Sequence, residues 1–468
     1  MAGWLLLLFI LLLGFAFARA VWPAPRRWSA ADPLRVAVAP PIGFGIASGV
    51  YFALHLVLEL DPYFSIGAVV VLTAVFAYAA KWRTQYADAD AAPQQSQLPV
   101  WLWLLFVAAA IMAFLTYLML SGAAPHGEWD AWSIWNLRAR FLFRAQDVAS
   151  PFSSAIDWAH PDYPLLLPGL IALLWHAAGS ESPGLAAAVN LLFAISAVSV
   201  PFFVVRHLRG PALASLCALA ILGATTLVRV SASQYADVPL AAYFVIAGAL
   251  LVYGIEVQTA GFGPVFLAGL AAGFAAWTKN EGLLFCASLV IAHFASLTSR
   301  SEISRRLHLV LPIAAGIVSV MAMVGHFKFR MAPANDLVNA SNSAVFGARM
   351  SDFNRYWVTF WAFVGEFLTF GSVLVPPIIV FAVWLALVRF RPKLTGAAIL
   401  PLTLATLQLA GYFAIYVLTP KDLDWQLNTS LPRLLLHVWP LAVTGIFLIS
   451  ADIFPPTPQP THPNTRSK

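Results

Sequence analysis

Residues 99–121 read PVWLWLLFVAAAIMAFLTYLMLS, an apolar stretch without one charged side chain. A helix rises about 1.5 Å per residue, so a stretch of this length reaches across the ~30 Å hydrocarbon layer of a bilayer. Backbone N–H and C=O groups find no water there and must bond within the segment. The stretch therefore predicts a transmembrane helix.

Stretches of the same kind recur from one end of the chain to the other. Only 10% of the 468 residues are charged and 60% are hydrophobic, whereas soluble domains are about 25% charged. This composition excludes a soluble globular protein, and no cluster of Lys and Arg indicates a nucleic-acid partner. We expect an all-α polytopic membrane protein in contact with membrane lipids. The thirteen predicted spans lie near 4–21, 36–58, 64–82, 99–121, 184–205, 211–230, 238–257, 263–278, 282–297, 308–327, 372–389, 396–418 and 433–453.

The distribution of basic residues predicts the orientation of these spans. Short loops on one side carry Lys and Arg, which marks the cytoplasmic side. The N-terminus is then expected outside and the C-terminus inside, with 165–178 as a helix at the membrane interface and not a span. Residues 1–20 have no basic residue before their apolar run, so we expect a retained first helix, although Ala18-Arg19-Ala20 resembles a cleavage site. The basic loop residues are Arg19, Arg26, Arg27, Arg35, Lys81, Arg83, Arg206, Arg209, Arg300, Arg305, Arg306, Arg389, Arg391 and Lys393.

The opposite, outer side carries longer loops, at 122–183, 328–371 and 419–432. In the first of these, Trp132 and Trp135 share a helical face with Ala139 and Leu142, and Arg138 and Arg140 are turned off it. This spacing predicts an amphipathic helix in the membrane plane. Asp130 stands at its start, either as a helix cap or as an acceptor for the proton of a substrate hydroxyl.

A proline-stiffened turn follows, His160-Pro161-Asp162-Tyr163-Pro164. His160 and Asp162 have the chemistry to bind substrate or a metal ion. One His and one Asp are fewer ligands than a metal site normally shows, so a structural turn is the alternative.

Two tight outer turns each carry a charged group between apolar spans. Asp237 marks a site unless it reaches water at the headgroups. Lys279 either pairs with Glu281 or neutralises the phosphate of a leaving group. The last outer loop contains Lys421 and ends at Arg433. Arg433 is placed either to bind a lipid phosphate or to extend its side chain to the headgroups by snorkelling.

In their order and sidedness, these outer motifs resemble the membrane glycosyltransferases of the GT-C fold. The resemblance is strongest to the bacterial branch that includes aminoarabinose transferase and the protein mannosyltransferases, and within it the motif sequences are similar to the RgtA/B/C/D-like group. Asp130 in Glu128-Trp129-Asp130 occupies the place of the acidic residue in that family's first outer loop. Tyr235-Ala236-Asp237 resembles its second aspartate motif. Thr278-Lys279-Asn280-Glu281-Gly282 resembles its Thr-Lys-Gly step with two residues inserted, and the family's Glu-Lys-Pro turn is represented only by residues 160–164.

The resemblance implies a bundle of about thirteen transmembrane helices with interfacial helices in the first large outer loop. Residues 99–454 would form the catalytic core. Residues 1–98 would add three N-terminal helices, and the Pro-rich tail 455–468 would be a disordered cytoplasmic segment.

The resemblance also implies a function. A polyprenyl-phosphate sugar would be the donor, and a lipid, glycan or protein the acceptor, at the outer face of a bacterial inner membrane. Asp130 and Asp237 would be catalytic, with inversion at the anomeric carbon; no cofactor is implied with certainty, and a divalent metal stays open. The substrate-binding residues would be Glu128, His160, Asp162, Tyr163, Lys279, Glu281, Lys421 and Arg433.

Other functions fit the same composition. A transporter or flippase for lipid-linked sugars would place polar groups near the membrane midplane in two matched halves, whereas these motifs gather on one side. A ligase of preassembled glycans and a non-catalytic scaffold share the outer-face design.

Overall fold

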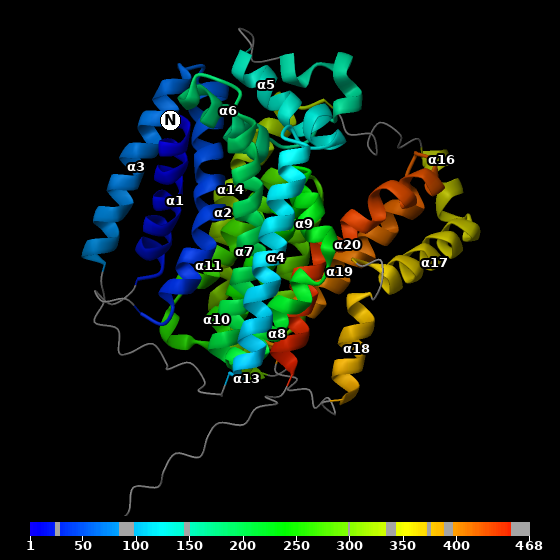
Figure 1. Ribbon diagram of the computed structural model, residues 1–468. Coiled ribbons are helices and arrows are strands. Elements are labelled where there is room, and N and C mark those ends of the chain that lie inside the picture. Colours follow the sequence, from blue (N-terminus) through cyan, green and yellow to red (C-terminus); the bar gives the residue numbers. More distant parts are fainter. Residues whose placement is uncertain are drawn as a thin grey trace, which may run out of the picture.

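The computed structural model describes residues 1–23, 29–83, 98–144, 150–297, 300–333, 343–371, 376–387 and 396–450. Every regular element in these ranges is a helix. Most of the helices stand side by side as a bundle, with α5 and α6 at the end where the chain begins and α13 at the other end (Figure 1). The tail predicted at 455–468 lies outside the described residues.

Nine of the predicted spans are helices long and apolar enough to cross a membrane, so the described chain has the build of a multi-pass membrane protein. Their bounds are Ala2–Val21 (α1), Asp32–Val57 (α2, Asp32–Tyr51, continued by the π-helical η1, Phe52–Val57), Pro62–Trp82 (α3), Val100–Ala123 (α4), Pro183–Arg209 (α7), Asp237–Glu256 (α10), Glu302–Arg330 (most of α13, Arg300–Arg306, then η6, Leu307–Leu309, and α14, Val310–Arg330), Leu400–Leu418 (α19) and Leu423–Ile449 (α20).

The span predicted at 211–230 is broken. It forms α8 (Pro211–Leu222) and α9 (Thr225–Ala232), which meet at an angle of 58°. Gly223 lies at the break, and glycine is among the weakest helix formers. Thr225 N–H leaves the helical ladder and donates to the carbonyl of Gly371 at 2.8 Å.

Two further predicted spans are short in the structure. Those at 263–278 and 282–297 are α11 (Gly263–Thr278) and α12 (Glu281–Ala295), of 16 and 15 residues. Only α18 (Pro377–Leu387) is described of the span predicted at 372–389. The number of spans is therefore nine by length and composition, or ten with the bent pair, within the described part of the chain.

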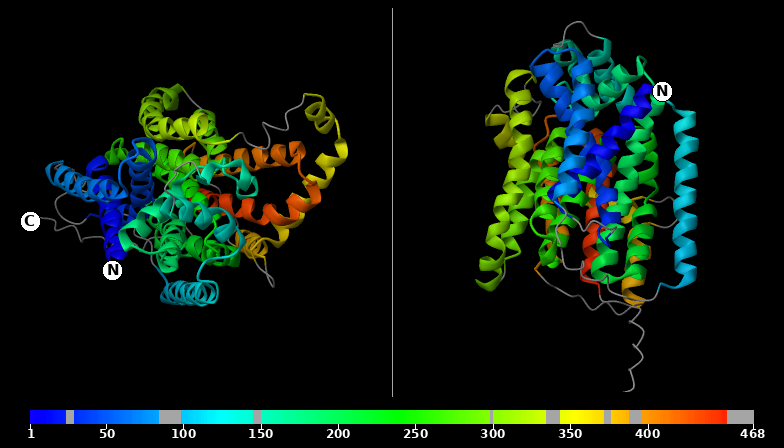
Figure 2. Two further views of the ribbon diagram at one scale, coloured as in Figure 1. Left: turned by 90° about the horizontal axis from the view of Figure 1, so that it is seen from above. Right: turned by 90° about the vertical axis from the view of Figure 1, so that its left-hand side faces the viewer.

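Helix α10 forms the centre of the bundle and α4 its edge. Every residue from Asp237 to Ile255 is buried, and α10 packs against α7, α11 and α20. A helix that is apolar on all sides is stable only when it is surrounded. In α4 only Leu102 and Tyr117 are buried, and Figure 2 shows this helix at the periphery in both views.

The N-terminal helices α1 to α3 are packed onto the rest of the bundle through α2. This helix contacts α6 and α7, and Tyr243 donates to the carbonyl of Pro41 at 2.8 Å. Gly14 of α1 meets Gly43 of α2 so closely that a Cβ on Gly14 would lie 1.9 Å from the carbonyl oxygen of Ala39. Small residues of this kind let membrane helices approach.

A cap of short helices covers the end of the bundle where α1 begins. It consists of η2 (Ala131–Trp135), α5 (Asn136–Arg144), η3 (Ser150–Phe152), η4 (Ser154–Ala159) and α6 (Leu166–Ala178). Residues Leu166 to Trp175 of α6 are all buried, and α6 contacts α1, α2, α3 and α5. Its apolar residues cover its whole circumference and are enclosed by protein, and with 13 residues it is not among the helices long enough to span a membrane.

The predicted amphipathic face at 132–142 needs a correction as well. Trp135, Ala139 and Leu142 are buried as expected, but Trp132 is 44% exposed and Arg138 is fully buried. The cause is η2, which is a π-helix. Each π-type turn takes one more residue than an α-helical turn, so the residues after it are rotated around the helix.

Two outer segments expected to be loops contain helices. Residues 328–371 include the end of α14, then α16 (Ser343–Met350) and α17 (Phe353–Thr369). Helix α20 begins ten residues before the predicted start of the last span, at Leu423. Asp422 caps it by accepting from Trp425 N–H at 2.8 Å. Its first turns alternate buried and exposed residues, so they are helical without being apolar enough to be recognised as part of a span.

The basic ends of several helices meet at the end opposite the cap. Arg83 after α3 donates to the carbonyl of Ala20 in α1 at 3.1 Å. Arg209 at the end of α7 donates to the carbonyl of Leu448 at the end of α20 at 2.7 Å. This clustering agrees with the alternation of basic loops predicted from the sequence.

Candidate active site

A cavity of about 310 Å³ opens beneath the cap. Its walls come from the turn 160–163, the start of α10, the α11–α12 turn, and the hairpin of α19 and α20. Segments that are far apart in sequence thus meet at one place. Eight of the ten residues predicted to act in the site line it, namely His160, Asp162, Tyr163, Asp237, Lys279, Glu281, Lys421 and Arg433.

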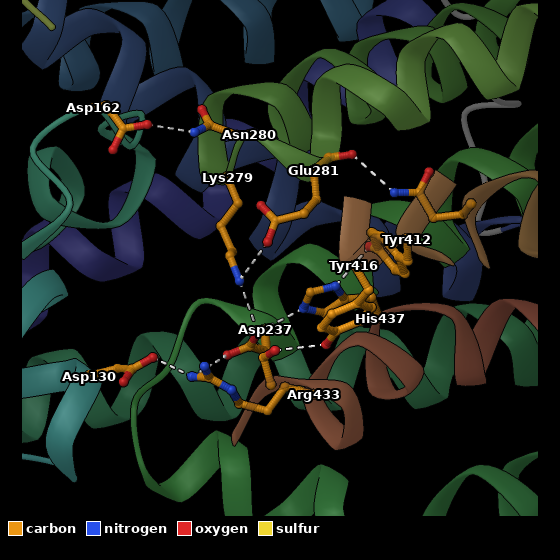
Figure 3. A network of polar contacts seen from close by, with 12 residues as sticks. Asp130, Asp162, Asp237, Lys279, Asn280, Glu281, Tyr412, Tyr416, Arg433 and His437 are labelled. Carbon is orange, nitrogen blue, oxygen red and sulfur yellow. Dashed lines mark hydrogen bonds and ion pairs between the residues drawn. The ribbon is translucent and has the colours of Figure 1, made fainter. Parts of the chain in front are cut away.

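Asp237 stands at the centre of the polar network (Figure 3). Its side chain is only 2% exposed, so the alternative that it merely reaches headgroup water is wrong. Its Oδ1 lies 3.1 Å from Lys279 Nζ and 2.7 Å from His437 Nε2, and its Oδ2 lies 3.9 Å from Arg433 Nη1. Asp237 is also in the first turn of α10, where the helix dipole favours a negative charge. These groups stabilise the carboxylate in its ionised form.

Lys279 connects two carboxylates. Its Nζ lies 3.1 Å from both Asp237 Oδ1 and Glu281 Oε1. Burial favours the neutral amine, but the attraction of Asp237 and Glu281 outweighs it and raises the pKa of Lys279 above its ordinary value. The residue sits in a tight turn that requires Gly282, because a Cβ there would lie 2.1 Å from the backbone carbon of Ala275. The predicted pairing of Lys279 with Glu281 is therefore confirmed, and Lys279 also lines the cavity.

Arg433 links Asp130 to the cavity. Its Nη1 forms an ion pair with Asp130 Oδ2, and its guanidinium lies 5.5 Å from the ring centroid of Tyr235. Asp130 precedes η2 but makes no side-chain capping bond there, so its role is not that of a helix cap. It reaches the cavity through Arg433 and does not itself form the wall. Arg433 lies inside α20 and is bound by protein groups, which excludes simple snorkelling.

His437 and Tyr412 extend the network and were not predicted. His437 is fully buried, and Tyr412 OH lies 2.9 Å from its Nδ1. An ionised Asp237 only accepts hydrogen bonds, so we assign the proton of the neutral imidazole to Nε2, and Tyr412 then donates to Nδ1. His437 lies four residues after Arg433, on the same helical face. An ionisable residue within a span, in register with a predicted site residue, was the signal available in the sequence.

The turn with Asp162 is fixed to the α11–α12 turn. Asn280 Nδ2 donates to Asp162 Oδ2 at 2.8 Å. Lys328 of α14 donates to Asn280 Oδ1 at 2.6 Å and to the backbone carbonyl of Asp162. Arg138, which the sequence placed on an exposed face, donates to the carbonyl of Tyr163 at 2.6 Å. This polar bracing holds the cavity wall in place.

Aromatic rings stack beside these contacts. The ring of Tyr163 lies 4.8 Å from that of His160 and 5.6 Å from that of Trp135, each at 15° or less between the planes. Lys279 Nζ lies 5.9 Å from the Tyr163 ring centroid. Burial and the nearby Glu281 raise the pKa of Tyr163, so its hydroxyl stays protonated near neutral pH. His160 and Tyr163 thus form a flat, aromatic part of the wall.

The remaining predicted residue, Glu128, is not brought into the cavity. It is exposed on the cap, and its backbone N–H donates to the carbonyl of Ser233 at 3.1 Å. Within the described ranges, no group of three or more His, Cys, Asp or Glu side chains is placed to hold a metal ion. The carboxylates of the cavity face Lys279 and Arg433 instead.

The arrangement can bind an anion through its cations and accept a proton on a carboxylate. A search for similar proteins found no family model, no curated protein and no solved structure that matches the chain.

Proposed function

We propose that this protein is a membrane glycosyltransferase that takes its sugar from a polyprenyl-phosphate carrier. One observation carries the proposal: Asp130, Asp237, Lys279 and Arg433, from four distant segments, form one network beside a cavity at one end of a membrane bundle. Buried carboxylates and cations that meet in a cleft are typical of catalytic sites.

The chemistry follows from these groups. An acceptor hydroxyl attacks the anomeric carbon of the sugar while the bond from that carbon to the phosphate oxygen breaks. The bonding electrons leave with the phosphate, and the hydroxyl proton passes to the carboxylate of Asp130. Arg433 and Lys421 stabilise the negative charge that develops on the leaving phosphate. Direct displacement by the acceptor inverts the anomeric centre.

The ion pair between Asp130 and Arg433 suits this sequence of events. In the absence of donor, each group neutralises the other. A phosphate that binds Arg433 competes with Asp130 for the guanidinium, because Arg binds phosphate and carboxylate through the same fork of N–H donors. Donor binding would then release the Asp130 carboxylate to act as the base.

Lys279 has a supporting role in this scheme. It is shared between Asp237 and Glu281, so most of its charge is already compensated. We assign to it the task of holding the two carboxylates together and of adding to the positive potential at the phosphate.

A lipid-linked donor fits the helical architecture. Nucleotide-sugar donors are commonly held by a sheet domain with a glycine-rich turn, and the described residues form helices without a sheet. A polyprenyl phosphate brings its own anchor into the bilayer, and its headgroup lies at the level where a cavity near the end of the bundle opens. By the distribution of basic residues, that end faces away from the cytoplasm.

The test uses the purified full-length protein in phosphatidylcholine nanodiscs with a radiolabelled polyprenyl-phosphate hexose and a panel of lipid, glycan and peptide acceptors. We expect transfer of label and release of polyprenyl phosphate. Translocation in sealed vesicles without release of polyprenyl phosphate would instead indicate a flippase, and transfer of preassembled glycans alone would indicate a ligase.

The decisive variant is Asp130→Asn, which keeps the shape of the side chain but removes the base. We expect a loss of transfer by about 10²–10⁴-fold, with an unchanged melting temperature because Asp130 is partly exposed. Asp424→Asn, an exposed position on α20, is the matched control and should transfer normally. Full activity in Asp130→Asn would remove the base from the proposal.

A further inference from the structure

The cavity wall contains buried polar atoms that no other part of the described chain satisfies. Glu281 Oε2, Gln426 Oε1 and Arg433 Nε are buried and have no hydrogen-bond partner among the described residues. All three residues line the cavity. Buried polar atoms are normally paired in folded proteins, so partnerless atoms on a cavity wall indicate groups that a ligand satisfies.

Glu281 is held in a fixed position. Its Oε1 is bound to Lys279 at 3.1 Å, and its backbone carbonyl accepts from Gln408 Nε2 at 3.1 Å. The carboxylate therefore has one oxygen bound to Lys279 and one without a hydrogen-bond partner among the described residues. An ionised carboxylate oxygen accepts hydrogen bonds and cannot donate them.

Gln426 is held on the neighbouring wall. Its backbone carbonyl accepts from Ser430 Oγ at 2.6 Å, and Ser430 Oγ lies 2.7 Å from Tyr416 OH. These two hydroxyls already bond to one another and to the backbone. The Gln426 amide oxygen is thus a second acceptor that receives no hydrogen bond from the described part of the chain.

These acceptors discriminate between kinds of ligand. An ionised phosphate has no hydrogen to donate, and it would be repelled by Glu281. A hydroxyl group can donate to Glu281 Oε2 or to Gln426 Oε1, and its oxygen can accept from Arg433 Nε. The orphaned atoms therefore match a neutral, polyhydroxylated head group.

We propose that Glu281 and Gln426 form a hydroxyl-recognition wall that binds the sugar ring of the donor, while Arg433 and Lys421 bind its phosphate. This inference rests on the proposed function and names the part of the site that recognises the sugar. It has a consequence for turnover. After transfer, the bare lipid phosphate no longer satisfies the hydroxyl-recognition wall, so the product binds more weakly than the donor and leaves.

The test compares two phosphodiester probes of equal charge, cyclohexyl farnesyl phosphate and glucosyl farnesyl phosphate, of which only the second carries sugar hydroxyls. Their dissociation constants are measured on the full-length protein in phosphatidylcholine nanodiscs, free of sugar detergents, by isothermal titration calorimetry. We expect the glucosylated lipid to bind wild-type protein at least about tenfold more tightly, since a site built for hydroxyls rejects analogues that lack them.

Each variant changes one of the two acceptors. Gln426→Leu should reduce the ratio of the two dissociation constants roughly fivefold, and Glu281→Gln roughly twentyfold because a charged acceptor is lost. Gln426→Glu keeps an acceptor and should retain the preference. Asn428→Leu, on the same helix but exposed, is the control and should match wild type. If Gln426→Leu fails to fold, as judged by its melting curve, the two isosteric Gln/Glu exchanges decide the question.

The outcomes separate this inference from the proposed function. An unchanged ratio in folded Gln426→Leu and Glu281→Gln overturns the hydroxyl-recognition wall even if the enzyme transfers sugar. A preference for the glucosylated lipid that these variants abolish supports the wall even if no transfer is found, in which case the glycosyltransferase proposal fails alone.

Discussion

Two buried ion-pair clusters, one at each end of the bundle, are built in different ways. At the end opposite the cap, Asp32 and Arg35 lie one turn apart in α2, both fully buried, with 3.2 Å between Oδ1 and Nη1. Ser29 N–H donates to Asp32 Oδ2 at 2.7 Å, and Arg35 donates to the carbonyl of Trp22 at 3.2 Å. All these partners are near neighbours in sequence.

The cluster beneath the cap is nonlocal. Asp237 is 42 residues from Lys279 and 200 residues from His437. It adjoins a cavity, and Glu281 and Arg433 each retain one atom without a partner within the described chain. In the local cluster, Asp32 and Arg35 form hydrogen bonds with nearby backbone groups, and these contacts fix the start of α2. The nonlocal cluster is left incomplete beside open space, which is what binding a ligand requires.

The largest difference is expected when each cluster loses its central carboxylate. Asp32→Asn removes the carboxylate that pairs with the buried Arg35, and Asp237→Asn removes one of the two carboxylates that contact Lys279. Each should lower the free energy of unfolding, by up to about 3 kcal/mol. Only Asp237→Asn should also abolish sugar transfer, by at least about 10³-fold per folded molecule. Melting temperature and transfer rate, measured on both proteins, check this. Equal losses of transfer in the two variants would contradict the distinction between the clusters.

A smaller effect is expected from the hydroxyl that supports His437. Tyr412→Phe removes the donor to Nδ1, which loosens the imidazole that orients Asp237, and should reduce kcat about fivefold with little change in KM. Tyr243→Phe is the matched control, because it removes a buried hydrogen bond to Pro41 that is remote from the cavity. It should cost about 1 kcal/mol of stability and leave kcat unchanged. A parallel loss of kcat in both variants would indicate a general packing defect and not a positioning role.

The smallest effect concerns the pH dependence of stability. The carboxylates around Lys279 hold its pKa above the ordinary value of 10.5. A group whose pKa is raised on folding binds more protons when folded, so its stabilisation is complete below about pH 10.5 and is lost as the pH rises through the folded-state pKa. The melting temperature should therefore fall above about pH 10.5 by a few degrees, and the fall should be shallower in Lys279→Met. Lys81→Met, at an exposed lysine in the last turn of α3, should keep the wild-type profile. Superimposable curves for all three proteins would refute the linkage.

Much of the helical fold could be predicted because hydropathy acts locally. An apolar segment such as 99–121 is stable in hydrocarbon only as a helix, and the structure shows it as the helix α4. The errors lie where this rule is weak. The start of α20 is amphipathic and not apolar, and the π-helical η2 rotates Arg138 into the core.

Most of the residues named from the sequence line the cavity, but the contacts between their side chains were not predicted. Asp237, Lys279 and Arg433 stand out in sequence because charges beside apolar spans are costly. His437 was missed since it is embedded in an apolar stretch and the sequence does not show which groups face it. Glu128 was included because it neighbours Asp130, yet its side chain is exposed on the cap.

The sequence by itself determined that the chain is a bundle of membrane helices, because each apolar run meets the bilayer independently of the others. Only the tertiary structure decided which carboxylate pairs with which cation. It also decided that Glu281 and Gln426 each keep one acceptor atom that no described residue donates to. Pairing depends on distances of a few ångströms between helices that are tens to hundreds of residues apart, and those distances are set by side-chain packing across the whole bundle.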